Sequence, residues 1–108
     1  IWFNGEIKGS VQLWRIRPDG GAPQQMTNDE RVNWFPHPSP DGQHIVYVAY
    51  EKGTRGHPRD KNIELRLMPA SGGTPKTLLA AFGGQGTMNV PCWSPDSRRF
   101  AFVRYQAE

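Results

Sequence analysis

The sequence contains one cysteine, no long apolar run and no sustained helical periodicity. Because Cys92 is alone, no disulfide can form within the 108-residue chain, and cysteine usage does not distinguish a reducing from an oxidising compartment. No apolar segment approaches the length of a membrane span or of a signal-peptide core. The lack of apolar residues at helical spacing argues against a helical fold.

Charge of one sign is not concentrated in any part of the chain. Thirteen Lys and Arg residues against ten Asp and Glu residues give a formal charge of +3, without a basic block or stripe. A dedicated nucleic-acid-binding protein clusters its cations on one face and spaces aromatic residues for stacking. The sequence therefore predicts no nucleic-acid partner.

Turn-forming and aromatic residues are abundant. Ten Pro and twelve Gly residues, with four Trp, five Phe and three Tyr, are typical of short strands separated by many turns. A length of 108 residues allows one hydrophobic core or part of one. The chain begins at Ile1, without Met and inside a strand-like run, which indicates a processed, trimmed or excised piece.

One stretch of the sequence occurs twice. Residues 33–50 contain two extended segments joined by a Ser-Pro-Asp-Gly turn, and residues 89–105 repeat most of this pattern. The Ser-Pro-Asp triplets at 39–41 and 94–96 are 55 residues apart. A period of this length is typical of arrayed blades rather than of helical heptads.

The repeated triplet has a structural explanation. Pro presets φ, and the Asp side chain accepts hydrogen bonds from amides of its own turn, which fixes the register of the two flanking strands. We therefore assign Asp41 and Asp96 a structural role rather than a catalytic one. Ser97 stands where the first turn has Gly42, and we expect a type I turn that tolerates the replacement.

Turn signals and periodicity delimit the other strands. The first strand is expected to end at the turn-forming pair Asn4-Gly5. Residues 11–17 place apolar groups on both faces, which suits a strand between two neighbouring sheets. Trp93 is expected to fill space between adjacent sheets.

Further matches extend the repeat to four strands. Residues 63–68 match 11–16, and the glycine-rich turn at 71–75 matches 19–23. An antiparallel meander of four strands with a period near this length is the blade of a β-propeller. We number the strands of a blade 1 to 4, with Ser-Pro-Asp ending strand 1. The predicted units are strands 2–4 of one blade over 1–30, a complete blade over 31–80, and strands 1–2 of the next over 81–108.

These repeats resemble those of the TolB family of WD-like β-propellers. The family's strand, Ser-Pro-Asp-Gly turn and "Ile-Ala-Phe-Val" strand match 35–48 and 90–103, and its "Leu-Tyr-Val-Met-Asp-Ala-Gly-Gly-x-Pro-x-x-Leu-Thr" pattern matches 13–27 and 65–79. The resemblance implies an all-β propeller of six blades, about two of which lie in this chain. It also implies a periplasmic or cell-envelope location in a bacterium. The remaining blades would come from a longer chain or, as the second choice, from homotrimerisation.

The meander determines which loops share an end of the sheet. The loops between strands 2 and 3 and between strand 4 and the next strand 1 lie together at one end, which we call the rim. Both carry extra residues in the second repeat, at 51–62 and 81–88. Loop insertions on one face are how repeat proteins elaborate a binding surface. The polar and charged candidates for partner or ligand binding on the rim are Asn33, His37, Arg55, His57, Arg59, Asp60, Lys61, Gln85 and Asn89.

Three patterns resemble reactive or ligand sites but lack the groups that such sites need. His37 and His57 have only Asp60 as an acidic neighbour, whereas metal sites use three or four donors. Cys92 with His37 lacks an oxyanion site and a cause for a lowered thiol pKa. The glycine-rich stretch 83–86 lacks the Lys-Ser/Thr pair of a phosphate-binding loop. No metal, cofactor or catalytic residue is therefore predicted.

The sequence favours a non-catalytic propeller module that binds a protein partner or a small ligand through the rim. Blades similar to these occur in the periplasmic TolB protein, in the gating propellers of prolyl-oligopeptidase-like peptidases and in some polysaccharide lyases. The alternative is therefore the propeller portion of a carbohydrate-active enzyme, or of a hydrolase whose substrate access it gates. Because one fold serves many functions, the choice depends on the site.

Overall fold

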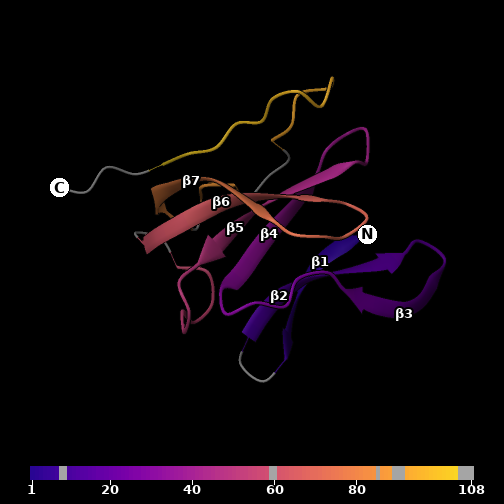
Figure 1. Cartoon of the computed structure of the whole chain (residues 1–108), viewed down its shortest axis with the longest axis horizontal. Coiled ribbons are helices and arrows are strands. Elements are labelled where there is room, and N and C mark those ends of the chain that lie inside the picture. The colour runs from indigo at the N-terminus through magenta and orange to yellow at the C-terminus, as the bar shows by residue number, and fades with distance from the viewer. Residues whose placement is uncertain (8–9, 59–60, 85, 89–91, 105–108) are drawn as a thin grey trace.

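The computed structural model describes residues 1–7, 10–58, 61–84, 86–88 and 92–104, and in these ranges it contains strands and no helix (Figure 1). The all-β prediction is therefore confirmed for this part of the chain. The strands are β1 (Trp2–Ile7), β2 (Ser10–Arg17), β3 (Gly20–Gln25), β4 (Val32–Pro38), β5 (His44–Tyr50), β6 (Lys61–Pro69) and β7 (Lys76–Gly83).

The strands form two antiparallel meanders. The first sheet has three strands in the order β1-β2-β3, and the second has four in the order β4-β5-β6-β7. Each strand pairs with its neighbours in sequence, so no connection crosses over a sheet. An isolated antiparallel bridge between Trp93 and Phe100 begins a further strand pair beyond the second sheet.

Strand β5 of the second sheet is buried on both of its faces. Six consecutive residues of β5, from Ile45 to Tyr50, are buried, and their side chains alternate between two hydrophobic clusters. One cluster joins β5 to Leu13 of β2 in the first sheet, and the other joins β5 to Trp93 and Phe100 in the segment 92–104. A strand covered on both faces needs a continuous apolar run, which explains the sequence Ile-Val-Tyr-Val-Ala-Tyr. Stacking of sheet on sheet therefore generates the core.

The first strand does not end where the sequence predicted. Asn4 and Gly5 lie inside β1 and pair with Leu13 and Gln12 of β2, so they do not form a turn. A Cβ on Gly5 would lie 2.7 Å from two atoms of the Trp14 ring. Gly5 is therefore explained by the close approach of an indole ring to the backbone rather than by turn geometry.

Each Ser-Pro-Asp turn is closed by its own side chains. Ser39 Oγ donates to Asp41 Oδ1 at 2.6 Å, and the amide of Gln43 donates to the same oxygen at 3.0 Å. The hydroxyl of Ser94 repeats the first bond with Asp96 at 2.6 Å. Hydrogen bonds from the serine hydroxyl and from turn amides hold the pKa of both carboxyls below the ordinary value of 3.8. The structural role assigned to these aspartates agrees with this geometry.

The fourth residue of the turn requires a left-handed backbone in both copies. Gly42 has φ of 74° and Ser97 has φ of 62°, and the amides of both residues close their turns by donating to the carbonyl oxygens of Ser39 and Ser94 at 2.9 and 3.0 Å. The turn therefore accommodates serine at this position, as expected, with a left-handed backbone that glycine adopts more readily. The amide of Asp41 donates to Ser97 Oγ at 2.9 Å. The two turns are therefore joined to each other, and the serine side chain provides a bond that glycine lacks.

Loops and turns separate to the two ends of the second sheet, as Figure 1 shows. The described part of the β5–β6 connection, 51–58, and the end of β7 lie at one end, and the turns at 39–43 and 70–75 lie at the other. The β1–β2 connection consists only of residues 8–9, whereas the β5–β6 connection consists of 51–60. The rim is thus the end of the sheet that carries the longer loops.

Candidate functional site

The described part of the β5–β6 loop is attached at both of its ends. The hydroxyl of Tyr50, which is fully buried at the end of β5, donates to the carbonyl oxygen of Pro58 at 2.9 Å. The carbonyl oxygen of Glu51 accepts hydrogen bonds from the amide and the hydroxyl of Thr54, at 3.2 and 2.7 Å. Gly53 adopts a positive φ of 84° that permits this tight turn. The described part of the loop therefore has a defined conformation that is held by hydrogen bonds.

The second rim loop packs against the first. Gly84 has φ of 121°, and a Cβ at this position would lie 2.1 Å from the carbonyl oxygen of Pro58 and 3.1 Å from the hydroxyl of Tyr50. The amide of Gly84 donates to the hydroxyl of the buried Thr87 at 3.0 Å, and the amide of Thr87 donates back to the carbonyl of Gly84 at 3.0 Å. The two insertions of the second repeat are therefore in contact with each other.

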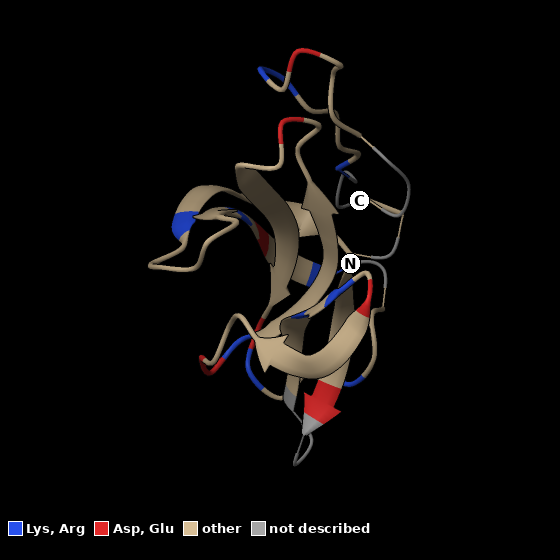
Figure 2. Ribbon diagram, turned by 90° about the vertical axis from the view of Figure 1, so that its right-hand side faces the viewer, with Lys and Arg blue, Asp and Glu red and all other residues tan. Residues whose placement is uncertain are grey.

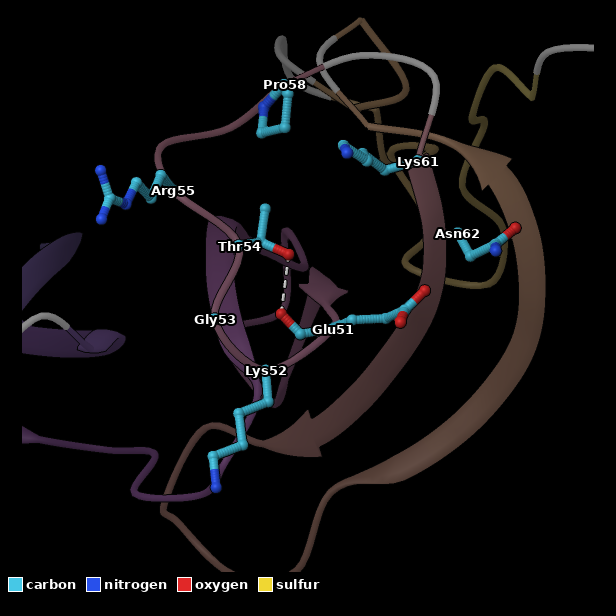
Figure 3. Close-up of a pocket in the computed structure, with 8 residues that line it drawn as sticks. All are labelled: Glu51, Lys52, Gly53, Thr54, Arg55, Pro58, Lys61 and Asn62. Atoms are coloured by element: carbon cyan, nitrogen blue, oxygen red, sulfur yellow. Dashed lines mark hydrogen bonds between the residues drawn. The ribbon is translucent and has the colours of Figure 1, made fainter.

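A pocket of about 470 Å³ lies inside the β5–β6 loop (Figure 3). In Figure 3 the side chain of Lys61 extends from β6 toward Pro58, and the carboxylate of Glu51 extends from the loop toward β6. Arg55 and Lys52 project outward from the loop. The pocket is lined by Glu51, Lys52, Gly53, Thr54, Arg55, Pro58, Lys61 and Asn62. Its volume is in the range of ligand-binding clefts, but its lining is polar and open.

His57 packs into an aromatic cluster beside this pocket. Its ring lies edge-on against the rings of Trp34 and Phe35, with centroid separations of 4.6 and 5.2 Å. His57 Nδ1 and Trp34 Nε1 are buried and have no hydrogen-bond partner among the described residues. Phe35 adopts φ of 60° at an irregularity of β4, and its amide donates to Asn4 Oδ1 at 2.9 Å. His57 is therefore a half-buried anchor of the loop rather than a solvated loop histidine.

The structure places His37 toward the other end of β4. It is the penultimate residue of that strand, next to the Ser-Pro-Asp turn, and its Nε2 contacts the carbonyl oxygen of Met88. The His37 carbonyl accepts a hydrogen bond from Trp93 Nε1 at 2.8 Å. His37 thus connects β4 to the following segment of the chain.

Asn33 is buried and lies in a polar network rather than on the rim surface. Its Nδ2 donates to Gln12 Oε1 at 2.9 Å and to Asp29 Oδ1 at 3.1 Å. Gln12 also accepts from the hydroxyl of Thr27 at 2.7 Å. The network joins β2 and the β3–β4 connection to the start of β4, so Asn33 has a structural function in this position.

The remaining predicted residues divide into two groups. Arg55 and Lys61 are exposed, and both line the pocket. The residues that lie outside the described ranges are Arg59, Asp60, Gln85 and Asn89.

An ionic cluster between the two sheets was not predicted. Arg66 of β6 pairs with Glu64 at 2.7 Å and with Asp29 at 3.6 Å, and Arg31 lies 3.9 Å from Glu64. Burial would raise the pKa of Glu64, but the hydrogen bond from Arg66 and the charge of Arg31 together hold it below its ordinary value. The only sequence signal for this cluster is that Glu64 and Arg66 alternate onto one face of β6, because Asp29 and Arg31 lie far from them in sequence.

Neither thiol chemistry nor metal ligation is evident in the described ranges. Burial raises the pKa of the Cys92 thiol, which is the opposite of what an activated nucleophile requires. Among the residues that the structure describes, no three His, Cys, Asp or Glu side chains gather as a metal site. Lys and Arg are interspersed with Asp and Glu along strands and loops (Figure 2). None of the described segments forms a helix with the length and hydropathy needed to span a bilayer.

Two known proteins are similar to this chain in sequence. It is 48% identical over 105 residues to an uncharacterized protein of Agrobacterium fabrum, and the match covers 97% of the chain and 36% of that protein. It is 27% identical over 95 residues to the Tol-Pal system protein TolB of Desulfosudis oleivorans, and this match covers 88% of the chain and 19% of that protein. No protein-family model matches the chain.

A solved structure matches the whole chain. It is described as a "putative TolB" from Agrobacterium tumefaciens, and the match has a TM-score of 0.96 at 46% sequence identity, covering 100% of this chain and 39% of that one. The chain thus corresponds to less than half the length of each of these proteins. Because the agreement in structure is accompanied by agreement in nearly half of the sequence, the chain has a TolB-like fold.

Proposed function

We propose that this chain is part of a TolB-like scaffold that binds a protein partner through the rim and performs no chemistry of its own. The observation that carries the proposal is the contact between the two rim insertions at Pro58 and Gly84. Loop insertions without a function would have no reason to pack closely against each other. A pair of loops that are fixed against one another provides a surface whose shape exists before the partner arrives.

Preorganisation is the physical advantage of this arrangement. A partner that binds a mobile loop must order it, and each ordered side chain costs about 0.5–1.5 kcal/mol. Here the hydroxyl of Tyr50 holds Pro58, and His57 packs on Trp34 and Phe35. The loop therefore requires little further ordering, and more of the interaction energy is available for affinity.

The proposal extends to the assembly and location of the protein. Further blades would complete a ring of six from additional chain, since the similar proteins are longer, or from two more copies of this chain. A periplasmic or cell-envelope location in a bacterium follows if the TolB relationship extends to the whole protein. Light scattering tests the assembly, because a stable species at three times the chain mass would favour the trimer.

Site-specific photo-crosslinking tests the binding face. A benzoylphenylalanine residue is introduced in place of Arg55 on the rim or, in a control, in place of the exposed Arg98 next to the opposite turn. Both proteins are irradiated in extracts of the source cell, and the adducts are compared by mass spectrometry. We expect a discrete protein adduct from position 55 that is absent from position 98. Adducts from position 98 alone would place the binding surface at the other end.

A further inference from the structure

The cations of the pocket have no partner among the described residues, a property that they share with Arg98 and Arg99 at the opposite end but not with four other described arginines. Arg15, Arg17, Arg31 and Arg66 make hydrogen bonds or ion pairs through their guanidinium groups. Within the described ranges, the side chains of three pocket residues make neither kind of contact; they are Lys52, Arg55 and Lys61. Their charges are therefore available to a ligand.

One carboxylate accompanies these three cations. Glu51 lies on the loop with its side chain extended toward β6, and Lys61 reaches into the opening from β6 (Figure 3). The charge of the described lining is therefore mixed but positive. A dense polyanion would place phosphates against Glu51, whereas a peptide has separated carboxylates and backbone N–H groups that can meet both kinds of charge.

We propose, on the basis of the binding function proposed above, that the pocket takes an acidic peptide segment of the partner. A carboxylate of that segment binds the ammonium group of Lys61, and a backbone N–H of the segment donates to Glu51. Arg55 and Lys52, which project outward, attract the acidic segment during its approach. The attachment of His57 and Pro58 keeps the loop wall opposite Lys61 in place.

Fluorescence anisotropy with defined peptides tests the proposal. The probes are labelled ten-residue peptides of one length and three kinds, in which Gly and Ser alternate with Glu, with Lys or with Gln. We expect the Glu peptide to bind most tightly and to weaken as salt is raised, because exposed charges are screened. We expect Lys61→Glu to weaken it about tenfold, because the charge reversal removes an attraction and adds a repulsion.

One variant provides the control. Arg98→Glu makes the same change of charge at the opposite end and should leave the affinity for the Glu peptide within about twofold. Equal binding of the three peptides, or equal losses in Lys61→Glu and Arg98→Glu, would overturn the inference. So would a labelled oligonucleotide that binds more tightly than the Glu peptide.

Failure of this inference can be told apart from failure of the proposed function. If position 55 still crosslinks a partner while the Glu peptide does not bind, the rim is the binding face and the acidic chemistry is wrong. If the Glu peptide binds but no partner is crosslinked from position 55, the pocket binds acidic peptides and the proposed partner-binding function of the rim is wrong.

Discussion

The carbonyl oxygen of Pro58 lies where a side chain at position 84 would begin, because a Cβ on Gly84 would be 2.1 Å from it. This contact connects the loop between β5 and β6 to the loop that follows β7. The β5–β6 loop is longer than strand connection requires, and the described residues that follow β7 lie at the same end of the sheet. The fit between them is the reason that we regard the rim as a built surface.

Replacing Gly84 by alanine should destabilise the protein by about 2–3 kcal/mol, because the new methyl group strains a left-handed backbone and also displaces the carbonyl of Pro58. Urea unfolding followed by tryptophan fluorescence measures the loss. Gly56→Ala is the matched control, because Gly56 has φ of 64° and a Cβ on it would have no other atom within 4 Å. That variant should lose only about 1 kcal/mol. Equal losses would show that the two loops do not constrain each other.

Tyr47 should make the protein sensitive to alkali. Burial, followed by the charge of Asp29, raises the pKa of its phenol from 10.0 to about 12. The folded state therefore holds the proton more tightly, so this contribution to stability is complete below pH 10 and is lost as the pH rises toward 12. The urea midpoint of the wild type should fall over that interval relative to the midpoint of Tyr47→Phe, so the two midpoints should separate, with the variant the more stable. Parallel declines in the two proteins would contradict this assignment.

The same phenol should be dispensable at neutral pH. Tyr47 Oη is buried and makes no hydrogen bond of good geometry among the described residues, although the nearby guanidinium group of Arg66 acts to lower the pKa of the phenol. Removing an unsatisfied buried hydroxyl relieves a desolvation cost, so Tyr47→Phe should change the free energy of unfolding at pH 7 by less than about 1 kcal/mol, with stabilisation the expected sign. A loss of about 2 kcal/mol or more, on the scale of a broken buried network, would mean that the hydroxyl is bonded.

The two turn aspartates should contribute to stability until strongly acidic pH. Since the folded pKa of both carboxyls is lowered, their contribution is present above the unfolded value of 3.8 and is lost as the pH falls through the folded value. The double variant Asp41→Asn with Asp96→Asn should unfold at lower urea than the wild type at pH 7. The difference should disappear once the wild-type carboxyls are protonated. Asp19→Asn, which removes an exposed ion pair with Arg17, should behave like the wild type throughout.

The stability of an Asn33 variant tests whether this residue has a structural role or a binding role. Its amide is buried and bonded to Gln12 and Asp29, so Asn33→Ala should cost about 1–3 kcal/mol of stability. Asn62 is exposed in the pocket, and Asn62→Ala should stay within about 0.5 kcal/mol of the wild type. Thermal unfolding of the two variants provides the comparison. If Asn33→Ala left the stability unchanged, Asn33 would again be a candidate for partner binding at the surface.

Local chemistry and periodicity made the repeated elements predictable. The Ser-Pro-Asp turns are closed by hydrogen bonds between neighbouring residues, so each turn could be predicted from its local sequence alone. A strand with apolar groups on both faces was predicted for residues 11–17, whereas the structure shows burial on both faces most completely in β5, whose apolar run is continuous. The loop insertions were located by comparing the lengths of the two repeats, which required no tertiary information.

The errors concern contacts between residues that are distant in sequence. Asn4-Gly5 has the composition of a turn, but the ring of Trp14 occupies the space over Gly5 and the pair continues a strand. The bond between the two turns was not predicted, because the amide of Asp41 donates to the hydroxyl of Ser97 in the other copy of the repeat. Asn33 is polar, and only its partners on β2 and before β4 show that it is buried.

The most direct test of the rim as the binding face compares two triple variants in quantitative affinity capture from extracts of the source cell. One variant replaces Lys52, Arg55 and Lys61 of the pocket by serine, and the other replaces Lys76, Arg98 and Arg99 at the opposite end. Both remove three cations, so differences in net charge cancel. A protein that the wild type captures should be lost with the pocket variant and kept with the other. Retention by the pocket variant, with loss in the opposite-end variant, would contradict the account.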